Sequence, residues 1–258
     1  MKIEEGDRLI LLTNDDGLYA GGLKTLTEVM QEFGKLVVIS TTESRSGMSQ
    51  ALTVKMPIRV KLLDETDTKR VYACSGTPAD GVKIAINRLL EREPDLLVSG
   101  INHGSNASVS VIYSGTMAAA IEGCLYGIDS VGFSLNSFSP NADFGPAKEI
   151  VREVMRSLVK ESLPEGVCLN VNIPSLDGES LKGIKVCRQA RGNWREEFEK
   201  RKDPMGKTYY WLTGSFHNHE PDAPDTDEWA ISNGYVSVVP VSVDMTAHNS
   251  LKEIRKRF

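Results

Sequence analysis

The stretch that decides the fold spans residues 9–17 and reads Leu-Ile-Leu-Leu-Thr-Asn-Asp-Asp-Gly. Its apolar half predicts a strand buried on both faces, as in a parallel sheet, and its polar half predicts the turn that follows. In open α/β sheets ligands bind just beyond the carboxyl ends of the strands, so we expect Asp15 and Asp16 at a binding site. Adjacent carboxylates repel each other, and a bound cation would relieve that repulsion. A turn that merely ends the strand is the alternative.

The composition indicates a globular protein without a general affinity for polyanions. The chain has 258 residues, of which 40% are apolar, and a formal charge of −5. These values allow a sizeable core and argue against a protein that binds duplex nucleic acid. Residues 1–7 lack the apolar core of a signal peptide, and no apolar run approaches the ~20 residues of a membrane span, so we expect a cytoplasmic protein with no membrane partner. Buried free thiols are expected for the scattered cysteines, Cys74, Cys124, Cys168 and Cys187.

Strand-like and helix-like segments alternate through the first two thirds of the chain. The strand-like runs cover residues 9–13, 35–40, 71–74, 95–99, 130–135 and 167–173. Apolar residues at helical spacing lie between them in residues 23–33, 82–90 and 150–158, and an alanine-rich run spans residues 116–123. Gly34 is expected to end the first helix in a left-handed conformation, and Thr77 with Pro78 to begin a later one. The alternation predicts an α/β protein with a mostly parallel sheet flanked by helices.

The pattern changes after Pro174. Strand-like segments at residues 184–188, 208–212 and 235–239 are separated by long polar stretches. We therefore divide the chain into an α/β catalytic core, residues 1–183, and a β-rich C-terminal extension, residues 184–258. Four aromatic residues flank the turn at residues 203–206 and predict a hairpin arm: Trp194, Tyr209, Tyr210 and Trp211. Because an isolated hairpin is marginal in water, this arm is expected to pack either on the chain's own core or on another subunit.

Two later segments have the composition of ligand-binding loops. Residues 100–106 are rich in glycine and amide side chains, and Asn102 and Asn106 offer oxygens to a cation or N–H groups to an anion. The turn formed by Ser114, Gly115 and Thr116 opens the alanine-rich helix. Free backbone N–H groups at a helix start attract anions, so this turn is a candidate phosphate site, with an ordinary N-cap as the alternative.

Side chains with oxygen ligands thus follow three separate strands. Asp15 and Asp16 follow the first, Ser46 the second and Asn102 a later one, so a parallel sheet would bring them to one edge. Oxygen ligands without histidine or cysteine favour a hard cation, Mg²⁺ or Mn²⁺. Asn106 and the turn before the alanine-rich helix would bind phosphate beside it. The reaction that fits this set is metal-assisted hydrolysis of a phosphate ester.

The same segments resemble, in order, the motifs of the SurE family of survival-protein nucleotidases. The matching residues are Asn14-Asp15-Asp16-Gly17, Arg45-Ser46-Gly47, Gly76-Thr77-Pro78, Ser99-Gly100-Ile101-Asn102, Gly104-Ser105-Asn106 and Tyr113-Ser114-Gly115-Thr116. The resemblance spans about residues 8–190, with further similarity around residues 234–246. It departs from the family pattern at residues 20–22, Ala-Gly-Gly in place of Ala-Pro-Gly, and at residues 41–42, Thr-Thr in place of Ala-Pro.

What the resemblance implies is a Rossmann-like fold and a metal-dependent 5′-nucleotidase acting on nucleoside monophosphates. Nucleoside 3′-monophosphates and short polyphosphate are further candidate substrates. One divalent ion per subunit, Mg²⁺ or Mn²⁺, is expected on Asp15, Asp16, Ser46 and Asn102, and the two aspartates are the expected catalytic residues. The C-terminal extension is expected to exchange arms within a homodimer or homotetramer.

Other protein classes fit less well. A receiver domain needs a further aspartate and a lysine at later strand ends, and a haloacid-dehalogenase-type phosphatase needs a nucleophilic aspartate where this chain has Asn14. A non-catalytic nucleotide-binding protein stays open until activity is assayed. The histidines are interpreted as surface or hydrogen-bonded residues, although His103 lies inside the proposed site loop.

Overall fold

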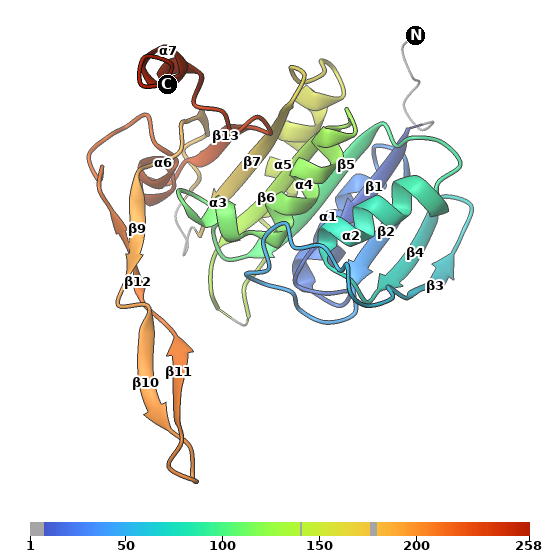
Figure 1. The fold of residues 1–258 in the computed structure, drawn as a ribbon. Helices are drawn as coiled ribbons and strands as arrows, with labels where there is room; N and C mark the ends of the chain where they lie inside the picture. Colours follow the sequence, from blue (N-terminus) through green and yellow to red (C-terminus); the bar gives the residue numbers. More distant parts are fainter. Residues whose placement is uncertain (1–7, 140, 176–179) are drawn as a thin grey trace.

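The computed structural model describes residues 8–139, 141–175 and 180–258, and within these residues a nine-stranded sheet forms the centre of the molecule (Figure 1). The acidic segment 1–7, and with it the expectation about a signal peptide, lies outside the described residues. The strand order is β3-β4-β2-β1-β5-β6-β7-β13-β8. Every pairing from β4 through β7 in this order is parallel, while β3 and β13 run antiparallel to their neighbours β4 and β7. The predicted mostly parallel α/β sheet is confirmed.

The strands of this sheet are β1 (Leu9–Thr13), β2 (Lys35–Thr41), β3 (Val60–Glu65), β4 (Lys69–Cys74), β5 (Leu96–His103), β6 (Asp129–Asn136), β7 (Val167–Pro174), β8 (Ile184–Val186) and β13 (Val236–Ser242). The longer helices are α1 (Gly21–Met30), α2 (Pro78–Ile84), which continues as the π-helical turn η1 (Ala85–Leu89), α4 (Gly115–Leu125) and α5 (Ala147–Leu158). Shorter ones are α3 (Ser110–Tyr113), α6 (Asp227–Ser232), the 3-10 turn η2 (His248–Ser250) and α7 (Leu251–Ile254).

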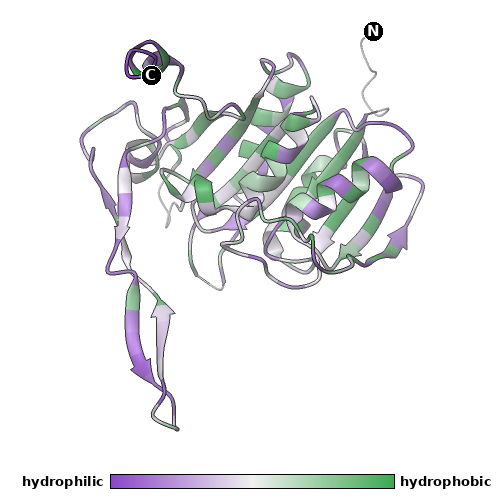
Figure 2. Cartoon of the chain, viewed as in Figure 1, coloured by the Kyte–Doolittle hydropathy of each residue, from purple (hydrophilic) through white to green (hydrophobic). Residues whose placement is uncertain are grey.

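Helices cover both faces of the sheet. On one face α1 and α5 pack on the strands, with Leu26 and Met155 completely buried in that core. On the other face α2 and α4 do the same around Leu11 and Leu97. Helices bury β1 and β2 on both faces, so apolar side chains that point to either face are removed from water and stabilise the fold. This explains the continuous apolar runs in these two strands (Figure 2).

The C-terminal residues divide between the sheet and an arm. β13 pairs with β7 and β8 pairs with β13, so two strands of the predicted extension, which begins at residue 184, belong to the central sheet. The arm itself consists of β9 (Gly192–Arg195), β10 (Phe198–Lys202), β11 (Thr208–Leu212) and β12 (Ser215–Asn218). β9 pairs with β12 and β10 with β11, both antiparallel, and the hairpin extends away from the body (Figure 1).

Several local predictions can be compared with the backbone. Thr77 is the N-cap of α2 and Pro78 lies in its first turn, as predicted, and the structure adds a capping box between Thr77 and Asp80. Gly34 is not in the left-handed conformation we predicted; a Cβ there would lie 2.4 Å from the Arg8 carbonyl oxygen, so close approach of two segments explains this glycine. β5 runs to His103, although we predicted a loop from residue 100 onwards.

The remaining sequence expectations concern cysteines and membranes. The four cysteines all fall in the described part of the chain, and each is buried with a free thiol, as predicted. Among the helices described, none has both the length and the apolar character that crossing a bilayer requires.

Candidate active site

The predicted site lies where the connections of the sheet change direction. β1 pairs with β2 on one side and with β5 on the other, and the chain visits β2 first before it crosses to β5. Loops that leave such neighbouring strand ends in opposite directions leave a crevice between them. Asp15 and Asp16 follow β1 at this point, and Asn102 lies near the end of β5. The topology therefore brings residues from two distant segments to one crevice.

Asp15 is buried against the start of α4. Its side chain accepts a hydrogen bond from the Thr116 hydroxyl at 2.5 Å and from the backbone N–H groups of Gly115 and Thr116. A Cβ at Gly115 would lie 2.8 Å from the Asp15 side chain, which explains the glycine in this turn. Burial raises the pKa of Asp15, and these hydrogen bonds oppose that effect only in part.

Asp16 is less buried and has one backbone partner. The N–H of His103 donates to its carboxylate at 2.9 Å. Burial and the neighbouring charge of Asp15 raise the pKa of Asp16 to about 6. Both effects disfavour a second negative charge at this place, and a divalent cation would favour it. The carboxylate pair therefore fits a cation site.

Asn102 presents its side-chain oxygen to the same region. Its amide nitrogen donates to the carbonyl oxygen of Gly104 at 2.7 Å, which fixes the orientation of the side chain. The oxygen then lies 3.5 Å from the Thr116 hydroxyl, and that hydroxyl is the one bonded to Asp15. Oxygens of Asp15 and Asn102 thus converge on one hydroxyl group, and this neutral-plus-anionic oxygen set suits Mg²⁺ or Mn²⁺.

Ser46 reaches this site on a loop after β2. The N–H of Arg45 donates to the carbonyl oxygen of Asp15 at 2.7 Å, which ties the loop to the end of β1. Ser46 is exposed, and its hydroxyl lies 3.0 Å from that of Ser44. Despite the unusual residues at 41–42, Ser46 lines the same pocket as Asp15 and Asn102.

The residues predicted to bind phosphate occupy two different positions. Asn106 and Ser114 line the pocket. Asn106 is held there by its side-chain amide, which donates to Ser134, and by its backbone N–H, which donates to Asn172, both at 2.7 Å. Ser114 also caps α4 by accepting a hydrogen bond from the N–H of Met117 at 3.0 Å, the geometry of the alternative interpretation.

Thr116 and Gly115 lie behind the pocket rather than in its wall. Thr116 is completely buried, and its hydroxyl is engaged with Asp15. Its structural position is therefore that of a residue that orients the Asp15 carboxylate. Among the described residues no cluster of three or more His, Cys, Asp or Glu side chains could hold a metal ion, which is consistent with a site that draws on serine and asparagine oxygens.

The pocket also contains residues that the sequence did not single out for it. Its volume is about 520 Å³. One wall comes from the arm, and the residues of the arm that line it are Trp194, Glu197, Leu212, Thr213 and Gly214. Ser110 and Tyr113 contribute from the core side, together with His103, which the sequence had placed inside the site loop. The sequence predicts that the arm's aromatic residues form a hairpin but does not assign them to the site, because no local pattern connects residue 194 to residue 15.

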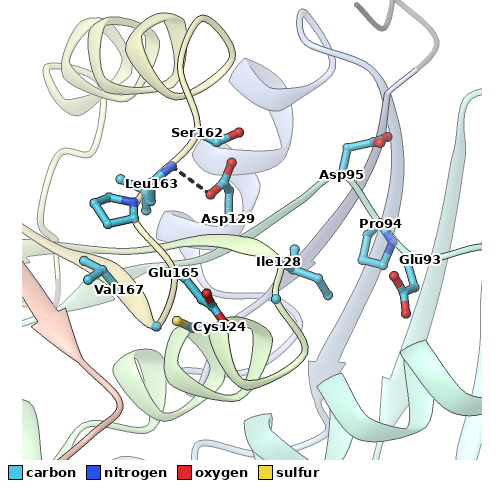
Figure 3. Close-up of a pocket in the computed structure, with 13 residues that line it drawn as sticks. Glu93, Pro94, Asp95, Cys124, Ile128, Asp129, Ser162, Leu163, Glu165 and Val167 are labelled. Carbon is cyan, nitrogen blue, oxygen red and sulfur yellow. Dashed lines mark hydrogen bonds between the residues drawn. The ribbon is translucent and has the colours of Figure 1, made fainter. Parts of the chain in front are cut away.

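A second cavity of about 440 Å³ lies at the amino ends of the strands, on the side of the sheet away from Asp15 (Figure 3). It is lined by residues at the amino ends of β5, β6 and β7, including Asp95, Asp129 and Val167. The Asp129 carboxylate there accepts the backbone N–H of Leu163, and none of the predicted site residues lines this cavity. Ligands of open α/β sheets bind at the carboxyl edge, so the pocket around Asp15 is the candidate active site.

Comparison with known proteins finds relatives that match over most of the chain. The model of the family described as survival protein SurE matches residues 10–196. Proteins named 5'-nucleotidase SurE from Christiangramia forsetii and Flavobacterium johnsoniae are 52% and 51% identical to this chain over 248 and 247 residues, which is 95% of each chain compared. A crystal structure of the SurE protein from Aquifex aeolicus superposes with a TM-score of 0.82 at 36% identity, covering 96% of this chain and 99% of that one.

Proposed function

Because the chain belongs to the survival protein SurE family, we propose that it is a 5′-nucleotidase, a phosphoric monoester hydrolase that releases phosphate from nucleoside 5′-monophosphates. We further propose that it uses one divalent cation, Mg²⁺ or Mn²⁺, held by Asp15, Asp16, Ser46 and Asn102. The observation that supports this most strongly is the convergence of the Asp15 and Asn102 oxygens at the strand ends where the connections reverse. When bound, such an ion supplies positive charge that polarises the phosphoryl group and favours deprotonation of an attacking water.

The chain's own residues contribute position and charge. Asp15 and Asp16 bring two negative charges that balance a divalent ion, so the phosphate of a substrate is not repelled. The Thr116 hydroxyl holds Asp15 in one orientation, and the hydrogen bond to Gly104 holds Asn102 with its oxygen toward the same place. The side chains of Asn106 and Ser114 line the pocket nearby and are our candidates for binding the phosphate oxygens.

An assay of phosphate release tests this proposal. We expect hydrolysis of nucleoside 5′-monophosphates that EDTA abolishes and that Mg²⁺ or Mn²⁺ restores. Nucleoside 3′-monophosphates and short polyphosphate belong in the same panel, because the sequence leaves both open as substrates. Nucleotide binding without release of phosphate under any of these conditions would contradict the proposal and favour the non-catalytic alternative.

We also propose that the protein is a homodimer or homotetramer held together by the arm. All residues of β10 and β11 are exposed, and Tyr210, Trp211 and Leu212 are 60%, 56% and 70% exposed. The hairpin extends away from the body (Figure 1). The rings of Tyr209 and Trp211 contact each other, but the apolar side chains of the hairpin stay largely exposed, so packing on another subunit would stabilise them. Light scattering is expected to show that the wild-type protein is an oligomer. The double variant Tyr210→Ser/Trp211→Ser is expected to form smaller species. A monomeric wild-type protein at micromolar concentration would contradict this.

The cytoplasmic location stays a prediction.

A further inference from the structure

We propose that the part of the arm that lines the pocket is the nucleoside-binding wall of the active site, and that Trp194 is the residue on which the nucleobase stacks. This wall is formed by Trp194, Glu197, Leu212, Thr213 and Gly214. Trp194 lines the pocket that also contains Asp15 and Asn102, although it lies far from both in the sequence. The inference rests on the proposed function, because it assigns the base-binding part of the same site.

Packing within the arm fixes the position of the Trp194 ring. Trp194 in β9 is directly opposite Phe216 in β12, and the two rings meet edge to face with their centroids 6.1 Å apart. Phe216 in turn packs on Gly192, where a Cβ would lie 2.2 Å from the ring. Trp194 is only half-buried, so part of the indole is supported by Phe216 while another part faces the pocket. A rigid, partly exposed aromatic ring is the group on which bases stack in nucleic-acid-binding proteins.

The turn after β11 completes the wall. The N–H of Thr213 donates to the carbonyl oxygen of Glu197 at 2.7 Å, and its hydroxyl to that of Glu196 at 3.2 Å. Gly214 has a φ of +107°, and a Cβ there would lie 2.6 Å from the Arg195 carbonyl oxygen. This close packing forms a tight corner, which would keep the wall in place.

The two ends of the pocket match the two ends of a nucleotide. Around Asp15 lie polar oxygens and N–H groups, which suit a cation and a phosphate. Trp194 and the half-exposed Tyr113 of α3 provide aromatic surface in the same pocket. A volume of about 520 Å³ lies within the usual range for small-molecule sites. Because stacking uses the face that every base possesses, we expect Trp194 to accept purines and pyrimidines alike.

A comparison of two substrates isolates this contact. Adenosine 5′-monophosphate has a base and ribose 5-phosphate has none, whereas both have the phosphate that is cleaved. In Trp194→Ala we expect kcat/KM to fall roughly 5- to 100-fold for the nucleotide, with the larger change in KM, and to stay near wild type for ribose 5-phosphate. Trp194→Phe should restore most of the loss. Trp211→Ala removes a tryptophan from the outer part of the same arm and should leave the ratio of the two kcat/KM values unchanged.

Two results would overturn the inference: an equal loss for both substrates in Trp194→Ala, which indicates a merely structural role, or no loss for either. If the wild-type protein hydrolyses neither compound, the proposed function fails. Calorimetry with adenosine then tests whether the wall binds a nucleoside, independently of hydrolysis. Adenosine should bind the wild-type, Trp194→Phe and Trp211→Ala proteins and bind Trp194→Ala at least about 5-fold more weakly. Equal affinity in all four would overturn the inference independently of hydrolysis.

Discussion

The carboxyl edge of the sheet and the outer hairpin differ in burial and in the origin of their contacts. The edge brings together residues from distant segments that are at most 9% exposed: Asp15, Asn102 and Thr116. In the hairpin, every residue of β10 and β11 is exposed, and each pairs with a residue close to it in the sequence. The structure of the carboxyl edge is stabilised by burial and by contacts across the whole sheet. The outer hairpin depends on its own ladder of hydrogen bonds, so the chain alone gives it little stability. A change at the edge should therefore alter the protomer, while a change in the hairpin should alter mainly its associations.

The largest contrast is expected between Phe133→Ala and Trp211→Ala. Phe133 in β6 is completely buried, so its truncation should lower the free energy of unfolding by about 3–5 kcal/mol. Trp211→Ala should change it by no more than about 0.5 kcal/mol in the dissociated chain. Urea unfolding at low and high protein concentration measures both. A cost for Trp211→Ala that grows with concentration would show that the hairpin docks on a partner.

The next effect concerns the metal ligands. Asp15→Asn removes one of the two charges that a divalent ion requires, while the shape of the buried side chain is kept. We expect kcat/KM to fall by at least about 100-fold, because even the outer partners of metal ligands contribute 10- to 100-fold. Calorimetry should show that the variant binds Mn²⁺ more weakly, and circular dichroism should show that its fold is intact. The exposed Asp67→Asn is the matched control, and unchanged metal affinity in Asp15→Asn would contradict the assignment.

A smaller effect separates two roles for Thr116. Thr116→Val removes the hydroxyl that donates to Asp15. We expect a loss of about 1–3 kcal/mol in transition-state stabilisation, the range of a charge-assisted hydrogen bond, and Thr116→Ser should recover most of it. If Thr116 acts by orienting Asp15, the affinity for Mn²⁺ should fall as well. A loss of activity at constant metal affinity would instead favour a direct contact with phosphate.

The smallest effect lies at the start of α6. Burial, reinforced by the charge of Asp227, raises the pKa of Glu228 from its ordinary value of 4.5 to about 7. The folded state therefore keeps a proton that the unfolded state has lost, so this group's contribution to stability falls as pH rises from about 4.5 to 7. Relative to wild type, Glu228→Gln should gain roughly 1–2 kcal/mol by pH 8 and little at pH 4.5. Unfolding in urea across this range measures the difference, with the exposed Glu161→Gln as control; a pH-independent difference would contradict the shift.

Some of the fold and site was predictable because the controlling interactions are local or follow from strand order. The apolar run before Asp15 predicts a buried parallel strand, and Thr77 with Pro78 predicts a helix start. Once strands are placed side by side, Asp15 and Asn102 must meet at their carboxyl ends. These inferences needed no knowledge of how side chains pack.

Other features were missed because they arise from contacts between distant segments. Gly34 looked like a helix cap, but it is a glycine because the Arg8 backbone passes close to it. The strands β8 and β13 looked like part of an appended unit, yet they extend the central sheet, since pairing partners cannot be read from a single segment.

The sequence by itself determined most strands of the central sheet, the start of α2 and the chemical character of the site, because periodicity, capping residues and the charge of Asp15 and Asp16 act over a few residues. Only the tertiary structure decided that the side-chain oxygen of Asn102, rather than its amide nitrogen, faces the site, that the Thr116 hydroxyl donates to Asp15, and that Trp194 lines the pocket. These outcomes depend on hydrogen bonds and packing between segments that only the folded sheet brings together.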